Sequence, residues 1–167
     1  PVATQISHAA GLALAVKLKG EDRAVWVSFG DGAVSRGDFH EGVNFAAIHK
    51  LPVIFFCQNN LYAISVPFEK QSPVPNVADR AAAYGIPGVI VDGSDVFDVY
   101  AKTREALERA LRGEGPTLIE AKTYRLDAHT TNDDDRKYRS EEEVEKWRAK
   151  DPIVVFRRYL IEHGVLT

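Results

Sequence analysis

The sequence of 167 residues contains no methionine, only one cysteine (Cys57) and no long apolar run. A single cysteine excludes a framework of internal disulfides, and Cys57 lies in an apolar stretch, where a buried and inert thiol is expected. No apolar run approaches the roughly 18 residues that cross a bilayer, and the beginning of the chain has no signal-like pattern. We therefore expect no membrane association and a cytoplasmic location, or the mitochondrial matrix in a eukaryote.

The chain also lacks a strong charge of either sign. Its net charge of -3 and pI near 6.0 argue against a nucleic-acid partner that is bound through bulk charge. With 45% hydrophobic and 27% charged residues, the composition is that of a globular protein with one real core. Because the chain starts at Pro1 without an initiator methionine, we expect a processed product or a piece of a longer protein.

Strand-like and helix-like segments alternate along the chain. Apolar runs rich in β-branched and aromatic residues begin at Val25, Val53, Gly88 and Thr117, and turn-forming or polar residues follow them. Such runs are typical of buried parallel strands. The helical segments between them predict an α/β fold with three layers, in which a mainly parallel sheet carries helices on both faces.

Helix boundaries can also be read from the sequence. Residues 37–50 have apolar side chains at the spacing of one helix face, and Asp95 can cap a helix that ends near Arg112. Ser140 and Glu143 form a capping-box pattern that starts a helical tail. We therefore divide the chain into an α/β unit over residues 1–139 and a helical tail of the same domain over residues 140–167.

The ends of the first two strands are the centre of the functional argument. Gly30-Asp31-Gly32 follows one strand and Asn59-Asn60 follows the next, with a single crossover helix between them. A right-handed crossover opens both strand ends at the same edge of the sheet. If the strands are neighbours, they lie about 5 Å apart, and Asp31 and Asn60 can then reach one ion.

The chemistry of these residues favours a metal between protein and phosphate. Asp-Gly alone is a common turn, and a dinucleotide-binding fingerprint fails because Ser35 stands where its third glycine is needed. A carboxylate would repel a bare pyrophosphate, but Mg²⁺ accepts carboxylate and phosphate oxygens together. Backbone N–H groups of Gly32 and Ala33, near the start of a helix, can hold phosphate oxygens.

Several segments together resemble the alpha subunit of the thiamine diphosphate-dependent first component of 2-oxo acid dehydrogenase complexes. The similar segments run from Thr4 to the C-terminus and include Gly30-Asp31-Gly32, Gly37-Asp-Phe-His-Glu-Gly42, Asn59-Asn-Leu-Tyr-Ala-Ile-Ser65, Val91-Asp-Gly-Ser-Asp-Val-Phe97 and Tyr124-Arg-Leu-Asp-Ala-His129. The branched-chain type is favoured over the pyruvate type, chiefly around residues 92–99 and 124–139. The resemblance implies the thiamine diphosphate-binding fold.

The resemblance also implies the roles of individual residues. Asp31, Asn60 and the backbone carbonyl of Tyr62 would bind Mg²⁺. Thiamine diphosphate would contact a larger set of residues, namely Val2, Gly30, Asp31, Gly32, Ala33, Asn60, Tyr62 and Ile64. In some branched-chain relatives the segment matching Thr4 and Gln5 also helps to bind K⁺. Gln58 departs from an arginine that some branched-chain relatives carry, which puts a diphosphate contact there in doubt.

His129 matches the active-site histidine of the family, which stabilises intermediates and serves acyl transfer to lipoyl groups. The residues after it belong to a family loop that becomes ordered over the active site when the cofactor binds. Thr130 matches a serine that a kinase phosphorylates in mammalian relatives, which suggests regulation at this position. The glutamate that activates the aminopyrimidine comes from the beta subunit in this family, so no residue of this chain is assigned that role.

The resemblance thus implies oxidative decarboxylation of a 2-oxo acid, most simply a branched-chain one, with acyl transfer to lipoamide. The implied partners are a beta subunit in an alpha₂beta₂ heterotetramer and a lipoyl-bearing acyltransferase. Family alpha subunits are about twice as long as this chain, which would be inactive without its beta subunit. Alternatives are a pyruvate or acetoin dehydrogenase alpha subunit, a truncated interaction domain without catalysis, and a nucleotide-binding or receiver-like module.

Overall fold

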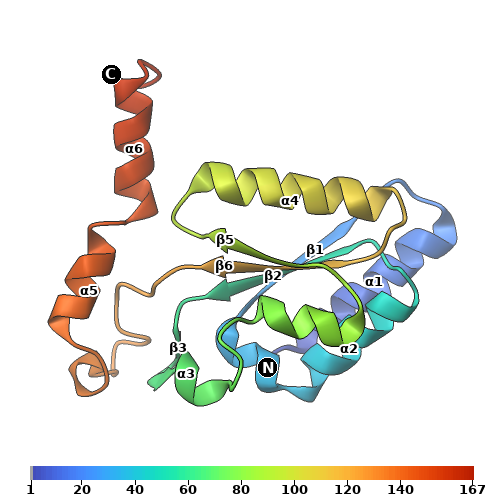
Figure 1. The fold of residues 1–167 in the computed structure, drawn as a ribbon, viewed down its shortest axis with the longest axis horizontal. Helices are drawn as coiled ribbons and strands as arrows, with labels where there is room; N and C mark the ends of the chain where they lie inside the picture. The colour runs from blue at the N-terminus through green and yellow to red at the C-terminus, as the bar shows by residue number, and fades with distance from the viewer. Residues whose placement is uncertain (1) are drawn as a thin grey trace.

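A four-stranded parallel sheet forms the centre of the computed structural model, which describes residues 2–167 (Figure 1). The strand order is β1-β2-β6-β5, and each of the three strand pairs is parallel. The strands are β1 (Val25–Gly30), β2 (Val53–Asn59), β5 (Gly88–Asp92) and β6 (Thr117–Lys122). Two short strands, β3 (Tyr62–Ala63) and β4 (Val66–Pro67), form a separate antiparallel hairpin.

Helices cover both faces of this sheet (Figure 1). The helices α1 (Thr4–Lys19) and α2 (Gly37–Ile48) and the 3₁₀ helix η2 (Ala78–Tyr84) pack on one face, and α4 (Val96–Leu111) packs on the other. The three-layer α/β prediction is therefore confirmed. Cys57 of β2 is buried in the core between the sheet and the helices α1 and α2. Burial, followed by the nearby Glu120 carboxylate, raises the pKa of its thiol.

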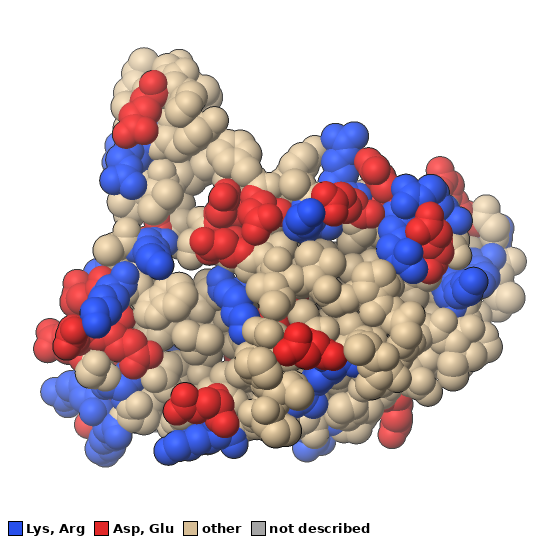
Figure 2. All heavy atoms as spheres, viewed as in Figure 1, with Lys and Arg blue, Asp and Glu red and all other residues tan. Residues whose placement is uncertain are grey.

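Small residues let α1 and α2 approach each other closely. Ala9, Ala10 and Ala13 of α1 are buried, and a Cβ atom at Gly42 of α2 would lie 3.2 Å from the backbone carbon of Ile6. The helix α1 ends before Gly20, whose φ of 65° suits a glycine C-cap. On the face shown in Figure 2, acidic and basic side chains are interspersed, which agrees with the small net charge.

Some element boundaries differ from those that the sequence predicts. The turn after β1 is a 3₁₀ helix, η1 (Asp31–Ser35), and the segment after β2 contains the β3–β4 hairpin and the single-turn helix α3 (Phe68–Gln71). The apolar run that begins at Thr117 predicts a strand as far as Tyr124, but β6 ends at Lys122. Tyr124 instead leaves the sheet and stacks on Trp147, with ring centroids 5.2 Å apart and planes 3° from parallel.

The C-terminal segment of residues 135–167 extends away from the sheet (Figure 1). It comprises η3 (Asp135–Lys137), α5 (Glu141–Arg148) and α6 (Pro152–Glu162). Ser140 caps α5, as predicted, by accepting a bond from the Glu143 backbone N–H at 3.2 Å. The helix α6 buries none of its residues and meets the start of α4 through Phe97 and Tyr159, whose rings are 4.9 Å apart. No helix in the described residues is long and apolar enough to cross a membrane.

Candidate functional site

The sheet confirms the prediction that the first two strands, β1 and β2, are neighbours. The strands β1 and β2 pair directly, with Gly30 opposite Gln58, so Asp31 and Asn60 leave the same edge on adjacent strands. The turn at Gly32 also lies against the β3–β4 hairpin. A Cβ atom at Gly32 would lie 2.9 Å from the Cβ atom of Ala63, so only glycine allows this approach.

Asp31 is a buried carboxylate that lacks a compensating charge. Its side chain belongs to a residue that is 1% exposed, and its Oδ2 accepts a hydrogen bond from the neutral amide of Gln71 at 3.0 Å. Within residues 2–167, no lysine, arginine or histidine forms an ion pair with it. Because an unpaired buried charge is costly, this carboxylate fits a site that receives a cation.

The other two expected metal ligands are engaged in local hydrogen bonds. Asn60 Oδ1 accepts from the Tyr62 N–H at 3.1 Å, and the Tyr62 carbonyl receives a 3.4 Å contact from Nη1 of Arg125. Asn60 lines a pocket of about 370 Å³ together with Gln58 and Arg125. Asn60 and Asp31 form no hydrogen bond with each other in the described structure, so the structure brings the strand ends together but does not show the side chains sharing a ligand.

The absence of a larger acidic cluster fits this ligand set. In the described residues, no group of three histidine, cysteine, aspartate or glutamate side chains could hold a metal. One carboxylate, one amide oxygen and one carbonyl oxygen are hard ligands of the kind that Mg²⁺ accepts alongside phosphates and water. The residues present thus fit Mg²⁺ better than a thiolate- or histidine-bound transition metal.

The backbone around Asn60 is strained. Leu61 and Ile64 have φ values of 72° and 57°, in the left-handed region that residues other than glycine rarely adopt. For the β-branched Ile64 this is a true outlier, and Nη2 of Arg125 holds its carbonyl at 2.6 Å. Strain of this kind is concentrated at functional sites.

Most of the remaining residues that the resemblance implies for the cofactor lie near these strand ends. Val2 lies near the start of the chain. Gly30 ends β1, and Ala33 is buried in η1. Val2 precedes α1 and is 56% exposed, and the side chain of Ile64 is 57% exposed. These side chains present apolar surface that a bound ligand can cover.

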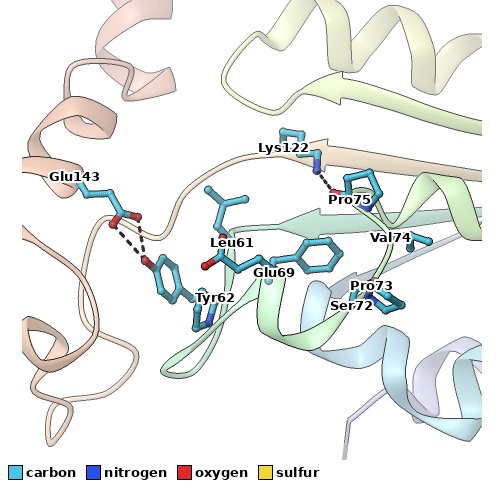
Figure 3. A pocket seen from close by; sticks show the side chains of 11 residues that line it. Leu61, Tyr62, Glu69, Ser72, Pro73, Val74, Pro75, Lys122 and Glu143 are labelled. Atoms are coloured by element: carbon cyan, nitrogen blue, oxygen red, sulfur yellow. Dashed lines mark hydrogen bonds between the residues drawn. The ribbon is translucent and has the colours of Figure 1, made fainter.

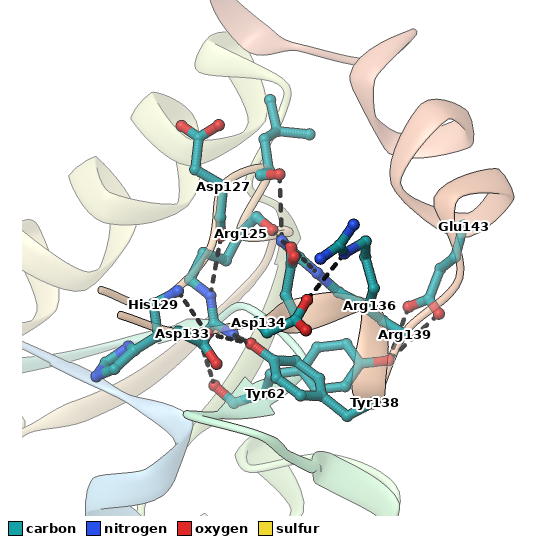
Figure 4. Close-up of polar contacts among 12 residues, drawn as sticks. Tyr62, Arg125, Asp127, His129, Asp133, Asp134, Arg136, Tyr138, Arg139 and Glu143 are labelled. Carbon is teal, nitrogen blue, oxygen red and sulfur yellow. Dashed lines mark hydrogen bonds and ion pairs between the residues drawn. The ribbon is translucent and has the colours of Figure 1, made fainter. Parts of the chain in front are cut away.

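His129 lies in the polar segment that follows β6, and its side chain is exposed. Its backbone N–H donates to Oδ2 of Asp133 at 2.9 Å, and Figure 4 shows its imidazole ring pointing away from that carboxylate. Thr130, next to it, is also exposed. The ring is therefore free to meet a substrate, although the described residues do not form a closed pocket around it.

A hydrogen-bond network holds the segment that carries His129 (Figure 4). Tyr138 donates to Asp133 at 2.5 Å and accepts from Arg125 at 3.0 Å, while Arg139 pairs with Asp135 at 2.5 Å and bonds the carbonyl of Arg125. The Tyr138 hydroxyl, with the His129 N–H, lowers the pKa of Asp133. Because Arg125 also binds the β3–β4 hairpin, the network joins this segment to the strained turn.

Tyr62 connects the hairpin to α5. Its hydroxyl donates to both carboxylate oxygens of Glu143, at 3.0 and 3.2 Å, and both residues line a pocket of about 650 Å³ (Figure 3). The capping-box pattern predicts that Glu143 turns back onto Ser140, but its carboxylate binds Tyr62 instead. Burial and then the hydrogen bond to Glu143 raise the pKa of Tyr62 to about 12.

We expect Tyr62 to be among the last tyrosines to ionise in an alkaline titration followed by tyrosinate absorbance. Because burial raises its pKa in the folded protein above that of an ordinary tyrosine, its contribution to stability is complete below about pH 10 and is lost as the pH rises toward 12. The Tyr62→Phe variant should lack this late phase, and its stability should fall by about 1–2 kcal/mol through the lost charge-assisted bond. Tyr159→Phe, at a residue without that carboxylate bond, is the control. A late phase that persists in Tyr62→Phe would contradict the assignment.

Comparison with solved structures places the fold among thiamine diphosphate-dependent enzymes. An enzyme from Mycobacterium smegmatis, described as thiamin diphosphate-dependent, matches 75% of this chain with a TM-score of 0.58 and 26% identity, over 22% of its own chain. The whole chain, residues 1–167, matches the model of the dehydrogenase E1 component family. The chain therefore belongs to this family.

The curated relatives include branched-chain and pyruvate enzymes. The chain is 55% identical over all of its length to the 2-oxoisovalerate dehydrogenase subunit alpha of Bacillus subtilis, and it covers 51% of that protein. It is 50% identical to the 3-methyl-2-oxobutanoate dehydrogenase subunit alpha of Mycobacterium tuberculosis, in a match that covers 99% of this chain and 45% of the relative. It is 48% identical to the pyruvate dehydrogenase E1 component subunit alpha of Staphylococcus aureus, in a match that covers 98% of this chain and 45% of the relative. The chain thus spans about half the length of the relatives it matches.

Proposed function

We propose that this chain is the diphosphate-binding part of the alpha subunit of a branched-chain 2-oxo acid dehydrogenase first component. The complete protein would decarboxylate the 2-oxo acid oxidatively and pass the acyl group to lipoamide. The buried and uncompensated carboxylate of Asp31, beside the end of β2, is the observation that carries this proposal. Family membership and the two branched-chain relatives, at 55% and 50% identity, support the substrate class.

In this proposal Asp31, Asn60 and the Tyr62 carbonyl hold Mg²⁺, and the N–H groups of Gly32 and Ala33 meet the diphosphate. Thiamine diphosphate, when bound, supplies the nucleophilic carbon and the electron sink for decarboxylation. Arg125 would share the Tyr62 carbonyl with the cation, which is possible because a carbonyl oxygen has two lone pairs. A K⁺ site near Thr4 and Gln5 belongs to the same proposal.

His129 would act at the substrate side of the site. Its exposed imidazole can donate a proton to, or accept one from, the reacting oxygen and the lipoyl sulfur during acyl transfer. Its backbone is fixed through Asp133, so the segment of residues 125–139 sets where the ring can lie. The beta subunit, in an alpha₂beta₂ assembly, and a lipoyl-bearing acyltransferase would supply the other groups.

Calorimetry on the complete alpha–beta assembly tests the proposal. Thiamine diphosphate should bind in the presence of Mg²⁺ and should fail to bind in excess EDTA. A decarboxylation assay over 2-oxoisovalerate, pyruvate and 2-oxoglutarate should then give the highest kcat/KM for 2-oxoisovalerate. No binding with Mg²⁺ and the partner present would support a non-catalytic interaction domain. A preference for pyruvate would identify a pyruvate-type enzyme, in line with the relative that is 48% identical.

A further inference from the structure

Glu120 is a charged residue in the interior of the sheet. It lies in the middle of β6, is 0% exposed, and belongs to a run of five consecutive buried residues, Thr117 to Ala121. Its carboxylate binds two segments that are distant in the sequence and a lysine of its own strand. Oε1 accepts from Nδ2 of Asn59 at 2.7 Å and pairs with Nζ of Lys122 at 2.8 Å, while Oε2 accepts from the backbone N–H of Ala78 at 2.8 Å.

The bond to Asn59 reaches the end of β2. Asn59 is also 0% exposed, and its Oδ1 accepts from the backbone N–H of Leu61 at 3.1 Å. Leu61 is the residue with a φ of 72°, so this bond holds the turn in a conformation that leucine rarely adopts. Asn60 lies between the two, and the position of its amide depends on this turn.

An apolar side chain would fill the position of Glu120 at less cost, because a buried ion pair seldom adds stability over apolar packing. The carboxylate is instead placed where it orients the amide of Asn59. Because Oε1 accepts from Nδ2 of Asn59, the amide is turned so that its Oδ1 accepts from the backbone N–H of Leu61.

We propose that Glu120 is a positioning residue for the cation-binding amide of Asn60 and acts through the side chain of Asn59 and the backbone of Leu61. The inference rests on the proposed function, since it concerns the same Mg²⁺ site. Residues that orient metal ligands typically change metal affinity by about 10–100-fold when they are altered.

Two substitutions separate positioning from stability. In Glu120→Gln, the amide oxygen should face the two donors Asn59 and Lys122, so the bond to Asn59 is kept and the bond to Ala78 is lost. In Glu120→Met both bonds are lost. At a fixed concentration of thiamine diphosphate, calorimetry on the alpha–beta assembly should give a half-saturating Mg²⁺ concentration near wild type for Glu120→Gln. For Glu120→Met we expect an increase of about tenfold.

The same comparison in an Asn59→Ala background tests whether the effect of Glu120 on Mg²⁺ binding is transmitted through Asn59. If Glu120 acts through Asn59, the two variants at position 120 should no longer differ there, because coupled residues are non-additive. Should Glu120→Met fail to fold, Asn59→Ala alone should raise the half-saturating Mg²⁺ concentration by about tenfold, and an unchanged value would overturn the inference.

Equal Mg²⁺ dependence in Glu120→Gln and Glu120→Met, or a difference that survives in the Asn59→Ala background, would also overturn it. In these cases the wild type still binds the cofactor, and the proposed function stands. A wild-type assembly that does not bind thiamine diphosphate with Mg²⁺ would instead refute both.

Discussion

Replacing Asp31 with asparagine should abolish Mg²⁺-dependent binding of thiamine diphosphate without lowering the stability of the cofactor-free protein. The substitution keeps the size of the side chain and an oxygen for the Gln71 amide, which now lies 3.0 Å from Oδ2. It removes a buried charge that has no cationic partner, so the free energy of unfolding should stay equal or rise. Because losing an outer-shell partner of a metal already costs about 10–100-fold in affinity, loss of the charged ligand itself should weaken cofactor binding by more than about 100-fold.

The measurement combines calorimetry of cofactor binding with denaturant unfolding of the cofactor-free protein. Asp22→Asn is the matched control, because it makes the same change of charge at an exposed residue. Asp22 precedes β1, whereas Asp31 follows the opposite end of this strand. The control should bind the cofactor as the wild type does. If Asp31→Asn retains affinity within a few-fold, Asp31 is not a ligand. If both binding and stability fall together, the carboxylate has a structural role.

The second large effect is expected at Gly88, the first residue of β5. An added Cβ atom would lie 2.2 Å from the carbonyl oxygen of Ala78 and 2.9 Å from the Cβ atom of Ala81. The helix η2 cannot easily retreat, since Glu120 holds the Ala78 N–H at 2.8 Å. Gly88→Ala should therefore lower the free energy of unfolding by about 3 kcal/mol, at the upper end for overpacking.

Urea unfolding followed by circular dichroism measures this difference. Gly11→Ala is the matched control, because a Cβ atom at Gly11, inside α1, would meet nothing within 4 Å. There the alanine should raise stability by about 0.5–1 kcal/mol through its better helix propensity. Similar effects of the two substitutions would show that the close approach of β5 and η2 is not what limits position 88.

The sheet, and the edge at which Asp31 and Asn60 lie, could be predicted because their signals are local. Each parallel strand is a short apolar run, and one helix between the first two strands makes a crossover whose strand ends share an edge. The placement of Asp31 and Asn60 at one edge of the sheet follows from this rule alone. The cap of α4 at Asp95 could also be predicted from the sequence, and the Asp95 side chain accepts a hydrogen bond from the Phe97 N–H at 2.8 Å.

Contacts between distant residues could not be predicted in the same way. Gln71 reaches Asp31 across 40 positions, and Arg125 reaches the carbonyl of Ile64 across 61. Leu61 and Ile64 adopt positive φ values without the glycine that normally marks such turns. For Glu120 a signal did exist, since a carboxylate between the apolar residues Ile119 and Ala121 of a buried strand needs a partner, but the sequence does not say which residues supply it.

The stacking of Tyr124 on Trp147 gives the protein an internal optical reporter. Trp147 is one of two tryptophans in the chain, and it holds α5 against Tyr124, the residue directly before the segment of residues 125–139 that carries His129. Any event that moves this segment changes the surroundings of the indole. Its fluorescence emission should therefore follow the segment directly, without an attached dye.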